Sequence, residues 1–210
     1  MRQPKIIIVD YEVGNTYSVL NALISLGYNK VNVSKDYKEI YDADAIILPG
    51  VGAFDACMTN LRKFKLNEIL DELVLVKAKP ILGICVGMQL MATSSEENGM
   101  HSGLNWINGH VVKLALPQPY LVPHVGWNNV KIIQKGSFFA NTIDEPHFYF
   151  DHSFHFICDE ENIVAITEYS SNIVAAIVRN NIHGVQFHPE KSQVSGLKLF
   201  RNFINYVSQC

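Results

Sequence analysis

The sequence predicts an α/β fold in which an open, mostly parallel central sheet is flanked by helices and carries an additional antiparallel sheet portion. Continuous apolar runs, typical of strands buried on both faces, alternate with helical patterns in the first half of the chain. From Asn105 onward, alternating runs separated by turn signals indicate antiparallel strands. Neither a linker nor a repeat interrupts the sequence, so a single domain over residues 1–210 is expected.

The individual elements follow from the same periodicities. In the first half, strands are predicted at residues 5–10, 31–33, 45–48 and 80–84. Helices are predicted at residues 15–26, from Ala53 onward, at 66–77 and at 86–93, with Gly27 as the stop of the first helix. In the second half, strands are predicted at residues 106–114, 125–133, 147–156, 163–169, 174–179 and 182–187, followed by an amphipathic helix at 195–207.

Composition excludes several classes of protein. A net charge of −3 argues against a nucleic-acid-binding surface, and no apolar run has the length of a membrane span. The chain enters a strand almost at once, so no signal peptide and a cytoplasmic location are expected. The four cysteines lack the paired spacing of disulfide or zinc sites. His152 and His155 would face opposite sides of one strand, so we expect neither a metal nor a cofactor.

The most informative segment runs from Gly83 through Cys85 to Gly87. An apolar strand pattern ends there and an apolar helix pattern begins, which is the cysteine form of a nucleophile elbow. A nucleophile on such a turn has a strained backbone, and small neighbours allow the chain to pack closely around it. The following helix start favours a thiolate. The alternative for this segment alone is a buried cysteine in an ordinary strand.

A second segment, Gly184-Val185-Gln186-Phe187-His188-Pro189-Glu190, supplies the partners that a nucleophile needs. Residues two apart in an extended segment face the same side, so Glu190 can orient His188, and His188 can take the proton of Cys85. Alone, this segment also fits a surface loop. The occurrence of both segments in one chain predicts a Cys85–His188–Glu190 triad.

The remaining candidate groups follow predicted parallel strands, where ligands gather in open α/β sheets. Gly50 to Gly52 can turn backbone N–H groups toward a substrate oxygen, and the N–H of Val86 can join them as an oxyanion hole. A phosphate loop is excluded, because no Gly-Lys-Ser/Thr sequence follows. These groups predict acyl transfer through a thioester, with an amide or ester as the susceptible bond.

The two segments resemble those of the class I (triad) glutamine amidotransferases. Further segments resemble the glutaminase subunits of imidazole glycerol phosphate synthase, namely Val9-Asp10-Tyr11 with Gly14-Asn15, residues 48–54, 94–97, 123–128 and 149–153, and His188-Pro189-Glu190-Lys191-Ser192. The resemblance therefore covers nearly the whole chain. It implies a flavodoxin-like sheet and a glutaminase in which Cys85 attacks the side-chain amide of glutamine, His188 is base and then acid, and Glu190 orients it.

The same resemblance implies roles for other residues. Gly52 and Val86 would form the oxyanion hole, while the substrate-binding residues would be Gly50, Gly87, Gln89, Glu97, His152 and Ser153. Ammonia would pass through a tunnel to a (β/α)₈ synthase subunit, which makes imidazole glycerol phosphate and an aminoimidazole carboxamide ribotide in histidine biosynthesis. The interface of this heterodimer would include Asn15, Trp127, Asn128, Tyr149 and Lys191. We expect the isolated chain to be a poor glutaminase until partner and acceptor ligand complete its oxyanion hole.

Departures from the family pattern keep other acceptors open. Glu12 stands in place of a glycine, Asp151 in place of an apolar residue, and Val86 in place of leucine. Residues 104–107 and 144–150 also resemble paralogues that supply ammonia to sugar amidotransferases of surface glycans. Two further alternatives are a stand-alone cysteine amide hydrolase, which would need no partner, and a non-catalytic subunit, which would not keep an intact triad.

Overall fold

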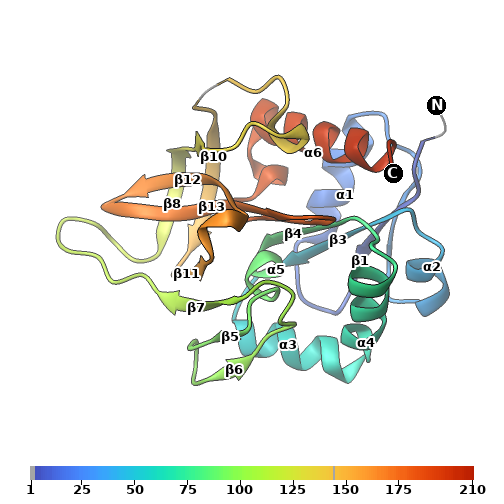
Figure 1. Ribbon diagram of the computed structural model, residues 1–210, viewed down its shortest axis with the longest axis horizontal. Coiled ribbons are helices and arrows are strands. Elements are labelled where there is room, and N and C mark those ends of the chain that lie inside the picture. Colours follow the sequence, from blue (N-terminus) through green and yellow to red (C-terminus); the bar gives the residue numbers. More distant parts are fainter. Residues whose placement is uncertain (1–2, 144) are drawn as a thin grey trace.

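The computed structural model describes residues 3–143 and 145–210. Asp144, part of a segment that resembles the sugar-amidotransferase paralogues, lies outside the described residues. One large sheet runs through the centre of the molecule, and two smaller sheets lie at one end (Figure 1). The strands of the large sheet are β1 (Ile6–Val9), β2 (Val31–Ser34), β3 (Ala45–Gly50), β4 (Ile81–Cys85), β9 (Lys131–Ile132), β12 (Ile163–Tyr169), β13 (Ser171–Arg179) and β14 (Ile182–Val185).

The order of the large sheet is β2-β1-β3-β4-β14-β13-β12-β9. The strands from β2 to β14 pair in parallel, whereas β13, β12 and β9 pair antiparallel. This confirms the prediction of a mostly parallel sheet with an antiparallel portion. The parallel strands β1, β3, β4 and β14 are buried along their whole length, as their continuous apolar runs require, because helices cover both faces.

Helices pack on both faces of this sheet (Figure 1). On one face lie α1 (Thr16–Ser25) and α6 (Gln193–Val207), and on the other α3 (Phe54–Lys63), α4 (Leu66–Asp71) and α5 (Val86–Gln89). Shorter elements are α2 (Tyr37–Tyr41), the π-helical continuation η1 (Glu72–Val76), and the 3₁₀ turns η2 (Ser137–Phe139), η3 (Glu160–Asn162) and η4 (Pro189–Lys191). Gly27 has a φ of +83° after α1, as expected of a helix stop.

The two smaller sheets are antiparallel for the most part. One pairs β8 (His124–Asn129) with β10 (His147–His152), so that His152 stands opposite His124. The other has the order β11-β7-β5-β6 and consists of β5 (Ser94–Ser95), β6 (His101–Ser102), β7 (Gly109–Lys113) and β11 (Phe154–Cys158). These sheets continue the molecule beyond the carboxyl ends of β3 and β4, where the cysteine lies.

The helix predicted at residues 86–93 is too long. α5 ends at Gln89, because the following carbonyl groups accept hydrogen bonds from a distant segment instead of continuing the helix. Leu104 N–H donates to Leu90 O, and Trp106 N–H donates to Met91 O. The strand predicted at residues 106–114 accordingly begins only at Gly109.

The single strand predicted at residues 147–156 is also wrong. It divides at Ser153 into β10, which pairs with β8, and β11, which pairs with β7 in a different sheet. His152 and His155 therefore lie in different strands rather than on opposite faces of one. The predicted strand 125–133 likewise divides into β8 and β9. Alternation in the sequence marks extended backbone, but it does not say where a strand leaves one sheet for another.

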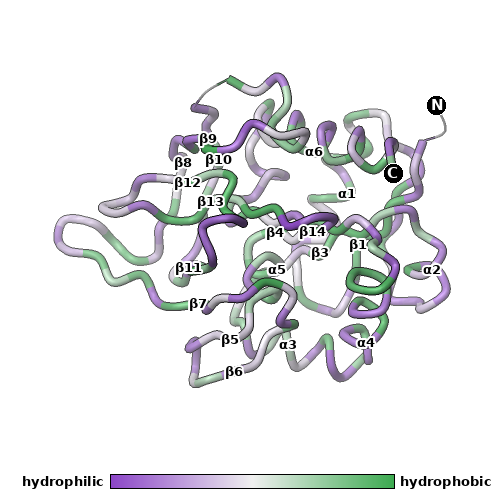
Figure 2. Tube along the Cα trace, viewed as in Figure 1, coloured by the Kyte–Doolittle hydropathy of each residue, from purple (hydrophilic) through white to green (hydrophobic). Residues whose placement is uncertain are grey.

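Apolar residues gather along the central strands (Figure 2), although Leu121 and Ile143 in outlying loops are apolar and exposed. Cys57 is fully buried and Cys158 is half-buried, while Cys210 is exposed near the end of the chain. Within residues 3–143 and 145–210, no helix combines the length and the apolar character that crossing a membrane demands.

Candidate active site

The turn between β4 and α5 presents Cys85 at the carboxyl edge of the sheet. The backbone of Cys85 has φ +54° and ψ −113°, a conformation that side chains rarely adopt. Gly87 packs against β3 so tightly that a Cβ atom there would lie 1.8 Å from Leu48 O. A Cβ atom at Gly83 would lie 2.6 Å from Gly87 O. The strained turn thus exists because two glycines let α5 and β3 close around it.

A cavity of about 250 Å³ opens at the sulfur of Cys85. Its walls come from five segments, and they consist of Val51, Gly52, Cys85, Val86, Gln89, Glu97, Asp151, His152, Ser153, Phe154, His188 and Lys191. This volume lies below the roughly 300–1,000 Å³ of sites for drug-sized ligands, so a small metabolite fits better. No cluster of three or more metal-ligating side chains occurs in the part of the chain that the structure describes.

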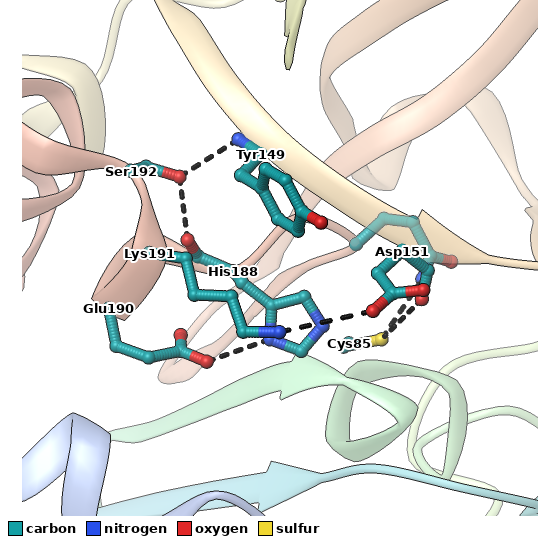
Figure 3. Close-up of polar contacts among 8 residues, drawn as sticks. Cys85, Tyr149, Asp151, His188, Glu190, Lys191 and Ser192 are labelled. Atoms are coloured by element: carbon teal, nitrogen blue, oxygen red, sulfur yellow. Dashed lines mark hydrogen bonds and ion pairs between the residues drawn. The ribbon is translucent and has the colours of Figure 1, made fainter. Parts of the chain in front are cut away.

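His188 lies between the sulfur and a buried carboxylate (Figure 3). His188 Nδ1 lies 2.8 Å from Glu190 Oε1, and their side chains are 3% and 1% exposed. Burial opposes protonation of the ring, but hydrogen bonds and charge interactions with Cys85 and Glu190 outweigh burial and raise the pKa of His188 to about 10. The ring is therefore an imidazolium at neutral pH, and a positive charge beside a cysteine favours the reactive thiolate.

The local geometry around Glu190 differs from the expected extended segment. Pro189, Glu190 and Lys191 form the 3₁₀ turn η4, with proline at its first position, where its fixed φ suits a helix start. The turn is held to β10, because Ser192 Oγ donates to His188 O at 2.6 Å and accepts from Tyr149 N–H at 3.0 Å. The contact between His188 and Glu190 is thus made by a turn rather than by neighbours on a strand.

Two acidic groups and an amide surround the rest of the cavity. Glu97 Oε2 accepts a hydrogen bond from Phe54 N–H at 2.8 Å, and burial raises the pKa of Glu97. Gln89 Nε2 donates to Phe154 O at 3.0 Å, which joins α5 to the β10–β11 corner. Asp151 O lies 3.9 Å from Cys85 Sγ. A cavity lined by the acidic side chains of Glu97 and Asp151 and by the sulfur of Cys85 suits a small substrate that carries an ammonium group.

The structure brings together most of the site residues expected from the sequence. Gly52, which has a φ of +87°, and Val86 line the cavity beside the sulfur, as do Gln89, Glu97, His152 and Ser153. Gly50 and Gly87 do not line it, because they are packed against each other with 2.6 Å between Gly87 N and the Cβ position at Gly50. Both glycines therefore contribute through packing of the turn.

Three of the five expected interface residues form one surface cluster near the cavity mouth. The rings of Trp127 and Tyr149 meet edge to face with 6.1 Å between centroids, and Lys191 Nζ lies 5.3 Å from the Tyr149 ring centroid. Asn128 has a different setting, since its amide binds His124 Nε2 and Glu168 O. Asn15 precedes α1 and makes no side-chain contact with the cluster among the described residues.

Sequence reasoning missed several groups around the sulfur. Lys191 Nζ lies 3.9 Å from Asp151 Oδ2 across the cavity mouth (Figure 3), and nothing in the sequence brings these two residues together. Gln186, by contrast, carried a signal, because it lies two residues before His188 in an extended segment and therefore faces the same side. Its amide donates to Cys85 Sγ at 3.7 Å.

Comparison with known proteins establishes the family. Residues 7–206 match the family model described as glutamine amidotransferase class-I. The chain belongs to the class I glutamine amidotransferases. Solved structures share this fold, among them a putative GMP synthase subunit of Thermoplasma acidophilum, with a TM-score of 0.76, 23% identity and coverage of 100% of this chain and 96% of that one. PurLQS of Thermotoga maritima has a TM-score of 0.74, 18% identity and coverage of 98% and 100%.

Curated relatives narrow the family of this amidotransferase. Over 200 residues it is 44% identical to imidazole glycerol phosphate synthase subunit HisH 2 of Methanococcus maripaludis, covering 95% of this chain and 98% of the relative. It is 41% identical over 203 residues to subunit HisH of Pelagibacter ubique, covering 94% and 98%. The HisH 2 subunit of Vibrio vulnificus is 44% identical over 203 residues, with coverage of 97% and 95%. The chain is a member of this family of subunits.

Proposed function

We propose that the chain hydrolyses glutamine to glutamate and ammonia through a thioester at Cys85. The observation that carries the proposal is the placement of His188 between the cysteine and the buried Glu190 in a small polar cavity. The thiolate attacks the side-chain amide carbon, and the amide C–N bond breaks as His188 gives its proton to the departing nitrogen. Water then attacks the thioester carbon, His188 takes a proton from that water, and the C–S bond breaks to release glutamate.

Each role in this reaction falls to a group in the cavity. Gly52 and Val86 supply backbone N–H groups for the oxyanion, which is supported by their place in the lining of the same cavity as Cys85. Gln89 and Glu97 bind the amino-acid end of glutamine, together with His152 and Ser153 of the opposite wall. The negative charge of Glu97 suits the substrate ammonium. Gly50 and Gly87 support the turn that carries the sulfur.

The ammonia serves a synthase partner in this proposal. The closely similar relatives are named as subunits of imidazole glycerol phosphate synthase, which implies a second, synthase subunit. That partner is of the (β/α)₈ type, receives ammonia through a tunnel, and forms imidazole glycerol phosphate and aminoimidazole carboxamide ribotide in the cytoplasm. The proposed interface contains the Trp127–Tyr149–Lys191 cluster with Asn128 and Asn15, beside the cavity mouth. The whole chain acts as one glutaminase domain.

Two measurements test the proposal. A glutamine-like electrophile, such as a diazo-ketone analogue of glutamine, is expected to modify Cys85 and to leave Cys57, Cys158 and Cys210 unmodified. Glutamate release is then measured with the chain alone and with a co-purified barrel partner plus its acceptor ligand. We expect the partner to stimulate glutamate release strongly. Full activity of the isolated chain would contradict activation by the partner, and an unmodified Cys85 would contradict glutaminase activity at this cysteine.

The alternative to the histidine pathway is a different acceptor of the ammonia. The relatives from Methanococcus maripaludis and Vibrio vulnificus both carry the numeral 2 in their names, which favours more than one subunit of this kind in a cell. In that case the glutaminase chemistry stays the same, but the partner is a sugar amidotransferase of surface-glycan synthesis. Ammonia transfer to the phosphoribosyl acceptor, measured with the co-purified partner, separates the two: product formation supports the histidine pathway and its absence the sugar pathway.

A further inference from the structure

A chain of hydrogen bonds that does not include His188 ends on the sulfur of Cys85. Its last group is Gln186, a fully buried side chain just beyond the end of β14. Gln186 Nε2 lies 3.7 Å from Cys85 Sγ and donates to it, a normal separation for a hydrogen bond to sulfur. The mechanism above assigns no task to this amide, although it touches a reacting atom.

The surrounding contacts fix which end of the Gln186 amide faces the sulfur. Gln186 Oε1 accepts a hydrogen bond from Gln89 Nε2 at 3.0 Å, and the second N–H of Gln89 donates to Phe154 O at 3.0 Å. A backbone carbonyl can only accept, so Gln89 must present its nitrogen to both neighbours. Gln186 must then present its oxygen to Gln89 and its nitrogen to Cys85. The donor to the sulfur is therefore determined by the network.

Two buried histidines hold the other end of this network. His152 Nδ1 donates to Phe154 O at 2.8 Å, which leaves His152 Nε2 to accept from His124 Nδ1 at 3.0 Å. His124 Nε2 accepts in turn from the Asn128 amide at 3.3 Å. Burial lowers the pKa of His152 to about 3 and that of His124 to about 4, so both rings are neutral at pH 7. Each ring then has one donor and one acceptor, and every contact is satisfied.

We propose that Gln186 is a further catalytic residue, which stabilises negative charge on Cys85 Sγ by hydrogen bonding, and that His152 and His124 are positioning residues that act through Phe154 O and Gln89. The inference rests on the proposed thioester chemistry, because it assigns a donor to the nucleophile of that reaction. It adds a second hydrogen-bond partner of the sulfur besides His188.

A hydrogen-bond donor to the sulfur acts in both halves of the reaction, the formation of the thioester and its hydrolysis. Before attack, the N–H of Gln186 stabilises the thiolate that His188 has formed. When the carbon–sulfur bond forms, the sulfur loses its charge and the hydrogen bond weakens. When water cleaves the thioester, the thiolate leaves and regains the hydrogen bond, so the leaving group is stabilised as well. A hydrogen bond to a charged group contributes more than one between neutral groups, which favours the charged states of this cycle.

Alkylation of Cys85 tests the proposal without glutamine or partner. The rate of reaction with iodoacetamide is measured from pH 5 to 10 in the wild type and in the variants Gln186→Met and Gln186→Glu. The titratable groups around the sulfur are His188, Tyr11 and Cys57, together with the cavity-lining Glu97, Asp151, His152 and Lys191. All of them are unchanged in these variants, and Gln186→Glu adds one carboxyl group beside the sulfur. We expect the pH of half-maximal rate to rise by about one unit in Gln186→Met, which makes the reaction about tenfold slower on the acid limb of the profile, and to rise further in Gln186→Glu.

Controls separate this effect from a loss of structure. Asn202 is a buried amide on α6 that donates to Phe138 O and Ala140 O away from the cavity, so Asn202→Leu should lower stability and leave the alkylation profile unchanged. Should Gln186→Met fail to fold, Gln186→Leu also lacks the N–H donor without adding a charge and gives the same readout. Coincident profiles in the wild type and the folded Gln186 variants would overturn the proposal.

The positioning residues have their own readout. His124→Phe removes the donor to His152 while keeping a flat ring between Phe150 and Tyr169, which stack on His124. We expect a smaller shift of the alkylation profile in the same direction, about twofold in rate, and restoration by His124→Gln, which can again donate and accept. An unshifted alkylation profile in His124→Phe would show that His124 and His152 do not position Gln186. If the alkylation profiles shift as expected but the protein does not hydrolyse glutamine, the proposed function is contradicted. The role of Gln186 as a hydrogen-bond donor to the sulfur is not.

Discussion

The turn from β4 to α5 and the two-stranded sheet of β8 and β10 stand on opposite sides of the same cavity, and they are held in different ways. Every residue of β4 is buried, and the glycines that flank Cys85 leave no room for a side chain. The strand β8 alternates buried and exposed residues and pairs with β10 along the backbone, and a pair of hydrogen-bonded histidines joins the two strands at one end. Close packing therefore fixes the turn that carries Cys85, while stacked rings and polar contacts together hold the opposite wall.

The two regions therefore tolerate structural change to different degrees. A close-packed turn tolerates little change, because any added atom must displace backbone. A wall built from hydrogen bonds, neutral histidines and a half-exposed ion pair can respond to pH or to a docked surface. The proposed partner face lies on this adjustable side, since Trp127 and Asn128 belong to β8 and Tyr149 to β10.

The largest effect is expected at the nucleophile. Cys85→Ala should lower glutamate release by roughly 10⁴-fold or more, because no other group can form the thioester. Thermal unfolding should change little, since the substitution removes one buried sulfur and keeps the backbone. Cys210→Ala, at an exposed position, serves as the control and should retain wild-type activity. A Cys85→Ala chain with undiminished glutamate release would refute the assignment of the nucleophile.

The packing of the turn is tested by a single methyl group. Gly87→Ala would place Cβ 1.8 Å from Leu48 O, so α5 or β3 must move. We expect the free energy of unfolding to fall by about 3 kcal/mol or more, with loss of activity. Gly136→Ala is the matched control, because nothing lies within 4 Å of its Cβ position and its φ is −101°. Equal urea midpoints for the two variants would show that the turn is not packed as described.

The charge on His188 predicts a dependence of stability on alkaline pH. Its pKa is about 10 in the folded protein and near 6.5 in an unfolded chain, so its contribution is full below about pH 6.5 and is lost as the pH rises through 10. In His188→Gln, the free energy of unfolding should fall less steeply than in the wild type over this window. Parallel dependences of the unfolding free energy on pH for His188→Gln and the wild type would contradict the raised pKa.

Glu190→Gln should lower glutamate release by roughly 10²- to 10⁴-fold.

The paired histidines of the opposite wall predict the reverse behaviour at acid pH. Burial lowers the pKa of His124 to about 4 and that of His152 to about 3, so both stabilise the protein fully above about pH 6.5. As the pH falls from 6.5 toward 4, the unfolded chain takes up protons that the folded chain does not, and stability falls. His124→Phe should reduce this slope, measured as the free energy of unfolding at pH 7, 6, 5 and 4. An unchanged slope would count against buried neutral rings.

The smallest effect is expected for the ion pair at the cavity mouth. Asp151 and Lys191 are 46% and 40% exposed and lie 3.9 Å apart, so solvent screens their attraction. Asp151→Asn should change the free energy of unfolding by less than about 0.5 kcal/mol. The KM for glutamine should rise a few-fold, because a negative charge near the substrate ammonium is lost, while Lys191→Met should not raise it. Equal KM values for Asp151→Asn and the wild type would remove Asp151 from substrate binding.

Local sequence determined much of the turn between β4 and α5 and less of the sheet of β8 and β10. The parallel strands, the turn at Cys85 and the contact between His188 and Glu190 were predictable, because each depends on neighbours within a few residues. The early end of α5 was not predictable, since it results from hydrogen bonds with Leu104 and Trp106. Nor was the division of residues 147–156 at Ser153, where one extended segment pairs first with β8 and then with β7.

Local sequence was sufficient to predict the class of fold and the segments that carry Cys85 and His188, because apolar periodicity and short motifs encode buried strands and tight turns directly. The Gln186 nitrogen faces the sulfur, and His124 meets His152 in another sheet, only because the fold brings these distant residues together. Hydrogen-bond direction depends on which groups meet across distant strands, and no local pattern records that meeting.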